Sequence, residues 1–329
     1  MTATLGPHEL IQPDFFVDLG PLVGHELHLK CEGMNFGGSI KLRTAASMIA
    51  AAERDALIGP DSVLIESSSG NLGVALSVIA AHKGLRFTCV TDTRCNQITA
   101  AMIRALGTEL VVLDTPDPAG GFLGARLDYV RRRCAADDRY VWLNQYANEA
   151  NWGAHYEGTA PEILKHFPDL DVLFVGVGTG GTAMGCARYF RDNASSVRVV
   201  AVDAVGSVSF GKPAAPRLIP GLGASVVPPL LDLSVFDDLV QVGELDTIRA
   251  CRLLASRGML LGGSTGTVVS GAVQWLARHD PNRRLRSMCI SPDMGDRYLS
   301  TLYNDDWVLQ HFGPAALLPL DGVSPNEKS

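Results

Sequence analysis

Residues Val172–Thr182 read VLFVGVGTGGT, an apolar run that passes directly into glycines and threonines. Near-continuous apolar residues are typical of a strand buried on both faces of a parallel sheet. The loop Gly176–Thr182 then opens a helix predicted over Gly181–Asp192. A glycine-rich loop at a helix N-terminus can bind an anion through its backbone N–H groups. This stretch predicts an α/β protein with an anion site at the carboxyl end of a strand.

The same alternation of strands and helices runs through most of the chain. Predicted strands are Glu26–Lys30, Ser62–Glu66, Arg86–Thr91, Glu109–Leu113, Val172–Val177, Val197–Val202 and Ser287–Ser291. Predicted helices are Ser39–Asp55, Asn71–Lys83, Gln97–Leu106, Phe122–Cys134, Gly181–Asp192, Leu245–Ser256 and Thr265–His279. We therefore expect two open, twisted, mostly parallel sheets with helices on both faces. The polar stretch Gln145–Trp152 separates two such series and marks the predicted domain junction.

Length and composition exclude several classes of protein. A chain of 329 residues with 47% hydrophobic and 19% charged residues predicts a globular protein of two domains. The net charge is -7 without a basic block, so we expect neither nucleic acid nor a membrane surface as partner. The seven cysteines form no C-x-x-C pair and have no zinc-ligand spacing, which predicts no metal site and reduced thiols in the cytoplasm. We find no signal-peptide pattern and no membrane-spanning run.

One of the six lysines occupies an unusual position. The loop Asn35–Lys41 (NFGGSIK) leads into the first predicted helix, with Ser39 as the predicted N-cap. Lys41 then lies in the first helical turn, where the helix dipole disfavours a cation. A lysine with a lowered pKa at the mouth of a loop suits carbonyl chemistry, because only the free amine forms a Schiff base. The other lysines have ordinary explanations; Lys30, for example, extends an alternating strand.

Two more loops each lead into the N-terminus of a predicted helix. Ser67–Gly73 (SSSGNLG) offers three hydroxyls, a glycine and an amide, a set that can bind a carboxylate. The alternative is a plain N-cap loop that uses one serine. Gly262–Thr267 (GGSTGT) offers Ser264, a neutral hydroxyl suited to a pyridine nitrogen, and its alternative is again a simple N-cap.

The glycines that follow the apolar run Val172–Val175 also permit a competing interpretation. Gly176, Gly178 and Gly181 form G-x-G-x-x-G, with Asp203 about twenty residues further on, which predicts a nicotinamide-dependent oxidoreductase. That interpretation uses neither Lys41 nor the serine loop, and the glycine and threonine cluster suits one phosphate monoester equally well. A special lysine, a carboxylate loop and a phosphate cup together are typical of pyridoxal phosphate enzymes.

From roughly Gly20 to Trp307 the chain resembles the cysteine synthase/cystathionine β-synthase family of fold-type II pyridoxal phosphate enzymes, which have the tryptophan synthase β-like fold. The motifs that resemble the family follow its order: NFGGSIK for the lysine loop, SSSGNLG for the substrate loop, GTGGT (Gly178–Thr182) for the phosphate cup, GLGAS (Gly221–Ser225) for the entrance loop, and GDRYLS (Gly295–Ser300) near the C-terminus. Phe36 and Leu42 stand where the family has proline and aspartate.

The resemblance implies pyridoxal 5'-phosphate as cofactor and assigns a role to each motif. Lys41 would hold the cofactor and serve as general base. The other implied cofactor ligands are Asn71 for the 3′ oxygen, Gly178, Thr179, Gly180, Gly181 and Thr182 for the phosphate, and Ser264 for the ring nitrogen. The implied substrate-binding residues are Ser67, Ser68, Ser69, Gly70 and Gly221. Tyr146 lies in the polar junction stretch between the domains and is a candidate for binding the second substrate; the alternative is a half-buried aromatic side chain at the interdomain seam.

Within the family, one subgroup is most similar. The segments that carry this similarity are Ile65–Gly73, Asn144–Trp152, Val202–Ser207, Gly262–Gly266 and Pro292–Leu299. The subgroup joins O-phospho-L-serine to L-glutamate through an aminoacrylate intermediate, giving N-(2-amino-2-carboxyethyl)-L-glutamate, a precursor of 2,3-diaminopropionate in siderophore or antibiotic biosynthesis.

The identity of the two substrates stays open at this point. Gly178 stands where a diaminopropionate relative has serine, so the alternatives are a cysteine synthase, with sulfide and O-acetyl- or O-phosphoserine, and β-replacement with another amine. Arg43 and Arg217 are candidate cations for a leaving phosphate.

The resemblance also implies the domain organisation. We expect a smaller, mobile α/β domain over 36–150 that carries the carboxylate loop. A larger domain, 1–35 plus 151–320, would bind the cofactor phosphate, and 321–329 would form a flexible tail. We further expect small-molecule amino-acid substrates and a homodimer.

Overall fold

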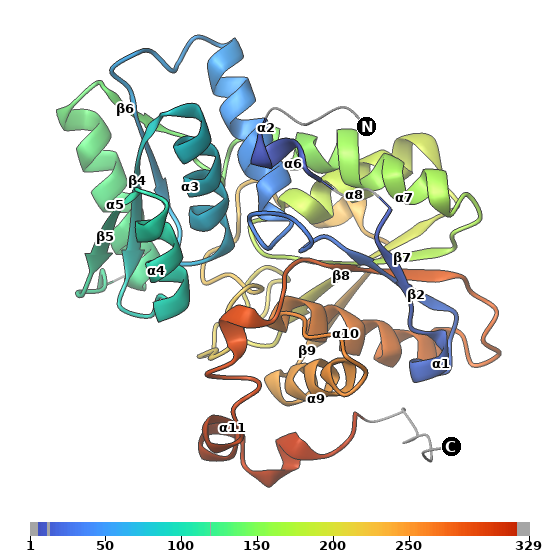
Figure 1. The fold of residues 1–329 in the computed structure, drawn as a ribbon. Helices are drawn as coiled ribbons and strands as arrows, with labels where there is room; N and C mark the ends of the chain where they lie inside the picture. The colour runs from blue at the N-terminus through green and yellow to red at the C-terminus, as the bar shows by residue number, and fades with distance from the viewer. Residues whose placement is uncertain (1–5, 12–13, 119, 321–329) are drawn as a thin grey trace.

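Ten strands form two sheets in the computed structural model, which describes residues 6–11, 14–118 and 120–320 (Figure 1). The six-stranded sheet has the order β1-β2-β10-β7-β8-β9, and only the β1–β2 pair is antiparallel. Its strands are β1 (Phe16–Asp18), β2 (Leu27–Cys31), β7 (Val172–Gly176), β8 (Arg198–Ala204), β9 (Asp238–Val242) and β10 (Ser287–Ser291). The prediction of mostly parallel sheets is confirmed.

Helices cover both faces of this sheet. The helices α1 (Gly20–Val23), α9 (Glu244–Ala255) and α10 (Gly263–His279) lie on one face, and α7 (Ala160–His166) and α8 (Gly181–Asn193) lie on the other (Figure 1). Successive side chains of a strand point to opposite faces. Val172 and Phe174 accordingly pack in the core on the α10 side, whereas Leu173 and Val175 pack in the core on the α8 side. The near-continuous apolar run of β7 follows from this double coverage.

The four-stranded sheet is all parallel and has the order β5-β4-β3-β6. Its strands are β3 (Val63–Ser67), β4 (Arg86–Asp92), β5 (Glu109–Leu113) and β6 (Tyr140–Trp142). The helices α2 (Lys41–Arg54), α3 (Asn71–Lys83) and α4 (Gln97–Ala105) pack on one face, and α5 (Gly121–Ala136) packs on the other. We call this sheet with its helices the small lobe and the rest the large lobe. The domain boundaries at 36 and 150 stay a prediction.

Short elements complete the chain. The helix α6 (Glu149–Ala154) continues into one turn of π-helix (His155–Thr159) and then into α7, so the predicted junction stretch is partly helical. The remaining elements are α11 (Asp305–Phe312) and the 3-10 turns Pro7–Glu9, Leu233–Val235, Asp296–Tyr298 and Pro314–Leu317. The predicted tail 321–329 lies outside the described residues. Within the described part of the chain, none of the helices has the length and apolar character needed to cross a membrane.

Two details differ from the expectations. The strands β1, β6 and β9 were not predicted; all three lie at sheet edges, where half-buried residues give no continuous apolar run. Ser39 is not the N-cap of the first long helix, because that helix begins at Lys41 and Ile40 occupies the N-cap position.

Candidate active site

A cleft of about 570 Å³ opens between the two lobes. It is formed by the loops that follow β3 and β7 and by the first residues of α2, α3, α8 and α10, which agrees with ligand binding at the carboxyl ends of parallel strands. Most of the predicted site residues line it: Lys41, Ser68, Ser69, Gly70, Asn71, Tyr146, Gly178, Thr179, Gly180, Gly181, Thr182, Gly221 and Ser264. Ser67 is the exception.

Lys41 is the first residue of α2 and lines the cleft. Within the described part of the chain, its amine has no hydrogen-bond or ion-pair partner. The surrounding protein removes water from the amine and thereby lowers the Lys41 pKa to about 8. Roughly a tenth of the side chains is therefore uncharged at pH 7, far more than at the ordinary pKa of 10.5, and an attack on an aldehyde carbon requires this uncharged form.

The phosphate cup is held open by glycines that leave no room for a side chain. Gly180 has φ +92, a left-handed conformation that favours glycine. A Cβ on Gly181 would lie 2.0 Å from Asn151 Oδ1. The same Asn151 donates from Nδ2 to Thr179 Oγ1 at 3.2 Å. The backbone at the start of α8 is thus exposed to the cleft as a cradle of N–H groups, which is the donor set that a phosphate needs.

His155 supports the cup from behind and was missed by the sequence analysis, as was Asn151. His155 is fully buried, and its Nε2 lies 3.2 Å from Thr182 Oγ1 and 3.1 Å from Thr44 Oγ1. Burial, reinforced by the charges of Lys41 and Arg43, lowers the His155 pKa well below its usual value, so the ring is neutral. The available signal was spacing: residues 151 and 155 lie four apart and share one helix face.

The opposite end of the cleft suits an aromatic ring nitrogen. Ser264 lies in the first turn of α10 with its side chain only 3% exposed. Gly221 faces it with φ +113, and a Cβ there would lie 2.2 Å from Ser264 Oγ. Because glycine alone fits at this position, the Ser264 hydroxyl stays accessible from the cleft.

Asn71 opens α3 and is held by residues of the large lobe. Its Nδ2 donates to Asp293 Oδ2 at 2.9 Å, and its Oδ1 accepts from Arg297. Tyr298 donates to the same carboxylate oxygen at 2.7 Å. Asp293 is a buried positioning residue that the sequence analysis did not identify, since a single aspartate after a strand has no distinguishing pattern.

Only one of the three serines in the loop Ser67–Gly73 stays available for a substrate. Ser67 is the last residue of β3, is fully buried and does not line the cleft, so the structure does not bring it together with the other predicted substrate ligands. Ser68 Oγ accepts from the N–H groups of Gly73 at 3.0 Å and Gly70 at 3.3 Å, a capping role. Ser69 is exposed in the cleft and, with the N–H groups of the first two residues of α3, remains available for a carboxylate.

The small-lobe wall of the cleft contains a buried cation, Arg126 of α5. Its side chain is 8% exposed and pairs with Asp92 (Nε to Oδ2, 3.4 Å), but its Nε and Nη1 make no hydrogen bond within the described residues. Tyr146 lines the same cleft, and burial raises its pKa to about 12 while the Arg126 charge lowers it. The guanidinium of Arg126, whose Nε and Nη1 are shielded from solvent, and the side chain of Tyr146 thus both lie in the wall of the cleft.

The two arginines proposed from sequence behave differently. Arg43 does not line the cleft; its guanidinium is bound by Glu32 and Glu162, so it is unavailable to a leaving phosphate. Arg217 lines the cleft mouth and donates to the carbonyl oxygen of Gly206.

These residues fit pyridoxal 5'-phosphate. The cup would hold the phosphate, Ser264 the ring nitrogen, Asn71 the 3′ oxygen, and the amine of Lys41 the aldehyde carbon. When bound, this group supplies an electron-withdrawing ring that stabilises negative charge at the substrate Cα. No cluster of three or more metal-ligating side chains occurs within the part of the chain that the structure describes.

Comparisons with known proteins agree with this geometry. Residues 6–293 match the family model described as pyridoxal-phosphate dependent enzyme. The chain is 43% identical to an N-(2-amino-2-carboxyethyl)-L-glutamate synthase of Cupriavidus metallidurans, over 86% of this chain and 84% of that one. It is 40% identical to a synthase of the same name from Ralstonia nicotianae, over 92% and 89%. The solved O-ureido-L-serine synthase is 31% identical, with a TM-score of 0.83 over 94% of this chain and all of that one. The chain therefore belongs to the family of pyridoxal-phosphate dependent enzymes.

Proposed function

We propose that this enzyme joins O-phospho-L-serine to L-glutamate, giving N-(2-amino-2-carboxyethyl)-L-glutamate and phosphate. In this β-replacement the Cβ–O bond of phosphoserine breaks, phosphate leaves with the electron pair, and the glutamate nitrogen bonds to Cβ and loses a proton. The names of two relatives, 43% and 40% identical to this chain over the aligned residues, support this product.

The observation that carries the proposal is the buried Arg126 with unused donors in the cleft wall. An arginine this buried without hydrogen bonds from Nε and Nη1 is costly unless a ligand supplies the acceptors. A phosphate offers several anionic oxygens and suits a guanidinium better than an acetyl ester does. The protonated Tyr146 hydroxyl adds a second donor.

The other residues divide the remaining work. We propose that Ser69 and the N–H groups at the start of α3 orient the substrate carboxylate, and that the Lys41 amine takes the proton from the substrate Cα. Ser264 is neutral, so it holds the ring nitrogen without protonating it; this favours prompt loss of the β-substituent over racemisation or transamination. Gly221 and Arg217 at the mouth would admit and orient the second substrate.

The nicotinamide alternative has no support in the site. Asp203 would have to reach a ribose hydroxyl, but it is fully buried, accepts from the N–H of Ala204 at 2.7 Å, and does not line the cleft. The phosphate cup is thus left without the acidic partner that a dinucleotide requires.

The test compares leaving groups in the wild type and two variants on one helix. We expect Arg126→Met to lower kcat/KM with O-phosphoserine about 10- to 100-fold and to change the value with O-acetylserine much less. The control Arg132→Met removes a surface arginine of α5, 71% exposed, that pairs with Asp128. Equal losses with both substrates would contradict the phosphate assignment. The product with glutamate is identified by mass, and turnover with sulfide instead would favour the cysteine synthase alternative.

We also propose that the enzyme is a cytoplasmic homodimer that serves siderophore or peptide-antibiotic biosynthesis, and that the small lobe moves to close the cleft. All seven cysteines are free thiols, which suits a reducing compartment. Closure would bring Arg126 of the small lobe toward the phosphate cup and Ser264 of the large lobe.

A further inference from the structure

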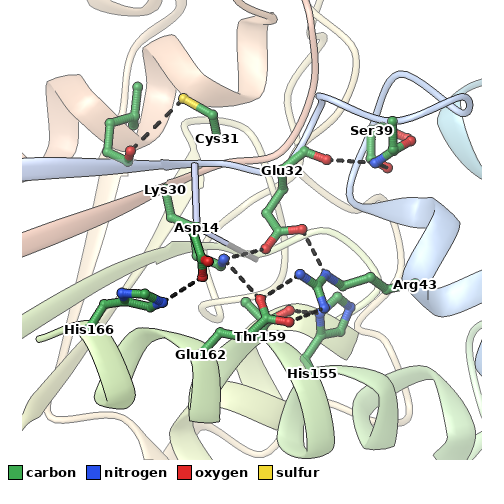
Figure 2. A network of polar contacts seen from close by, with 12 residues as sticks. Asp14, Lys30, Cys31, Glu32, Ser39, Arg43, His155, Thr159, Glu162 and His166 are labelled. Atoms are coloured by element: carbon green, nitrogen blue, oxygen red, sulfur yellow. Dashed lines mark hydrogen bonds and ion pairs between the residues drawn. The ribbon is translucent and has the colours of Figure 1, made fainter. Parts of the chain in front are cut away.

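A closed ring of four charged side chains, three of them buried and one partly exposed, lies beside the helix that carries Arg43 (Figure 2). It consists of Lys30 in β2, Glu32 directly after β2, Arg43 in α2 and Glu162 in α7. Lys30 Nζ lies 3.2 Å from Glu32 Oε1 and 3.0 Å from Glu162 Oε2. Charges alternate in sign around the ring, and the net charge is zero. We call these four residues the charge ring.

Arg43 has the largest share of hydrogen bonds in the charge ring. Its Nε donates to Glu32 Oε2 at 2.8 Å, while Nη1 and Nη2 donate to the two oxygens of Glu162 at 2.9 and 2.6 Å. The guanidinium plane is thereby fixed by two carboxylates from different elements of the large lobe. Burial opposes the charge on Arg43, but the carboxylates outweigh it and raise its pKa, so the side chain stays charged.

Stability alone is a weak explanation for such a site. Removing two ion pairs from water costs about as much as their attraction returns, and apolar residues can often replace them. What the ring does supply is a fixed geometry. The side chains of Lys30, Glu32 and Arg43 are 1%, 2% and 7% exposed and that of Glu162 is 22% exposed, so water and salt screen the ring much less than a surface ion pair.

The position of Lys41 depends on this geometry because Lys41 has no polar anchor of its own. Its amine lacks a partner within the described residues, so only the backbone at the start of α2 sets its place. Residues i and i+2 of a helix point about 200° apart. With Lys41 directed into the cleft, Arg43 is directed to the rear, where Figure 2 shows it against Glu32 and Glu162.

Neighbouring contacts also tie the start of α2 to the large lobe. Ile40 packs in the core on the α8 side and its N–H donates to the Pro292 carbonyl at 2.7 Å. Thr44 reaches Thr182 of the phosphate cup through His155. Leu42 and the later apolar residues of the helix instead pack in the core of the small lobe. The helix therefore joins the two lobes, and its first turn is bound to the large one through Ile40, Arg43 and Thr44.

We propose that Arg43 is a positioning residue: through the charge ring it fixes the first turn of α2 on the large lobe, so that Lys41 keeps its place relative to the phosphate cup and Ser264 when the small lobe moves. The rigid part of the enzyme would then include residues 38–44, which the sequence analysis assigned to the mobile domain. The inference depends on the family's cofactor and not on the identity of the two substrates.

The test separates geometry from charge balance. Arg43→Met leaves an excess carboxylate, and the protein is expected to be destabilised. The double variant Arg43→Met/Glu162→Gln is neutral again, since Lys30 and Glu32 remain as a pair. We expect the double variant to unfold at nearly the wild-type temperature, measured without cofactor, while Lys41 captures pyridoxal 5'-phosphate covalently about tenfold more slowly or worse. Capture is measured by absorbance and by borohydride trapping.

Two controls make the result specific. Pyridoxine 5'-phosphate lacks the aldehyde and cannot bond to Lys41, so its dissociation constant reports the cup and Ser264 alone and should change less than twofold (about 0.4 kcal/mol). The variant Glu53→Gln removes a half-exposed ion pair with Lys83 at the other end of α2 and should capture at the wild-type rate. A folded double variant with wild-type capture would overturn the proposal. So would equal losses of capture and of pyridoxine 5'-phosphate binding, since the cup itself would then be damaged.

Discussion

Thr182 Oγ1 of the phosphate cup lies 3.2 Å from Nε2 of the buried His155, and Nδ1 of the same ring lies 3.0 Å from Thr159 Oγ1. A neutral imidazole has one donor and one acceptor nitrogen. Nε2 also lies 3.1 Å from Thr44 Oγ1. When the hydrogen is on Nε2, the ring is the donor to these two hydroxyls, and the Thr182 hydroxyl hydrogen is free for a phosphate oxygen. The ring thus holds Thr182 in place and, in this tautomer, leaves it able to donate.

His155→Phe keeps the ring volume but removes both nitrogens. We expect cofactor affinity to fall by about 1–3 kcal/mol, because buried hydroxyls lose their partner and Thr182 is no longer oriented. Fluorescence titration measures the affinity. Thr159→Val removes a hydroxyl that lies on the far side of the ring, and it should weaken binding less. Equal effects of the two variants would contradict the orienting role.

The same residue predicts an acid limit to stability. The His155 pKa is well below 6.5 in the folded protein and near 6.5 in the unfolded chain, so the unfolded chain binds more protons below that pH. The contribution of the neutral His155 to the free energy of unfolding is present above pH 6.5 and is lost as the pH falls below it. We expect urea denaturation to show a smaller loss of stability on acidification in His155→Phe than in the wild type.

Alanine at the two crowded glycines should damage the site by steric contact. At Gly181 the new Cβ would lie 2.0 Å from Asn151 Oδ1, and at Gly221 it would lie 2.2 Å from Ser264 Oγ with a φ of +113. We expect each variant to lose about 1–3 kcal/mol of stability or cofactor affinity. A Cβ added to Gly153 of α6 would meet no described atom within 4 Å, so Gly153→Ala is the control and should change stability by about 1 kcal/mol at most.

The sequence predicts what local patterns determine. Continuous apolar runs such as Val172–Val175 reveal central strands, and the glycine- and serine-rich loops that open helices place Lys41, Asn71 and Ser264 in one cleft. The edge strand Tyr140–Trp142 was missed because each of its residues is only half buried.

Residues brought in by tertiary packing could not be found in this way. Arg126 is one of many arginines and lies on an ordinary helix; only the fold shows that it is buried beside the cleft. Lys30 fits an alternating strand with an exposed face, but α7 covers that face and Glu162 meets the lysine. Alternation indicates which residues share a face, whereas the rest of the fold determines whether that face meets water.

Glu66 predicts a dependence of stability on pH that opposes that of His155. It is fully buried at the end of β3, where it accepts from the N–H groups of Ser67 at 2.8 Å and Gln145 at 3.1 Å. Burial outweighs these bonds and raises its pKa from 4.5 to about 7. The folded protein then holds a proton that the unfolded chain has lost, so this contribution decreases as the pH rises from 4.5 to 7.

Between pH 4.5 and 7 the raised pKa of Glu66 lowers the free energy of unfolding by about 3 kcal/mol. We expect Glu66→Gln to reduce this loss of stability in urea denaturation between pH 4.5 and 7, whatever its absolute stability. Glu53→Gln, a surface carboxylate on α2, is the matched control and should leave the profile unchanged. An unchanged profile in Glu66→Gln would show that the carboxyl is ionised throughout.

The lowered pKa of Lys41 predicts how the protein without cofactor captures it. Only the free amine attacks the aldehyde, and desolvation moves the Lys41 pKa from 10.5 to about 8. The capture rate should rise with pH, reach half its maximum near pH 8 and level off above it. Ionisation of the cofactor phosphate occurs near a pKa of about 6 and gives a separate, lower inflection. The pH profile of pyridoxine 5'-phosphate binding should show only the lower inflection, which comes from the phosphate. A capture midpoint near 10.5 would mean that the amine is hydrated, and the desolvated pocket inferred around Lys41 would then be wrong.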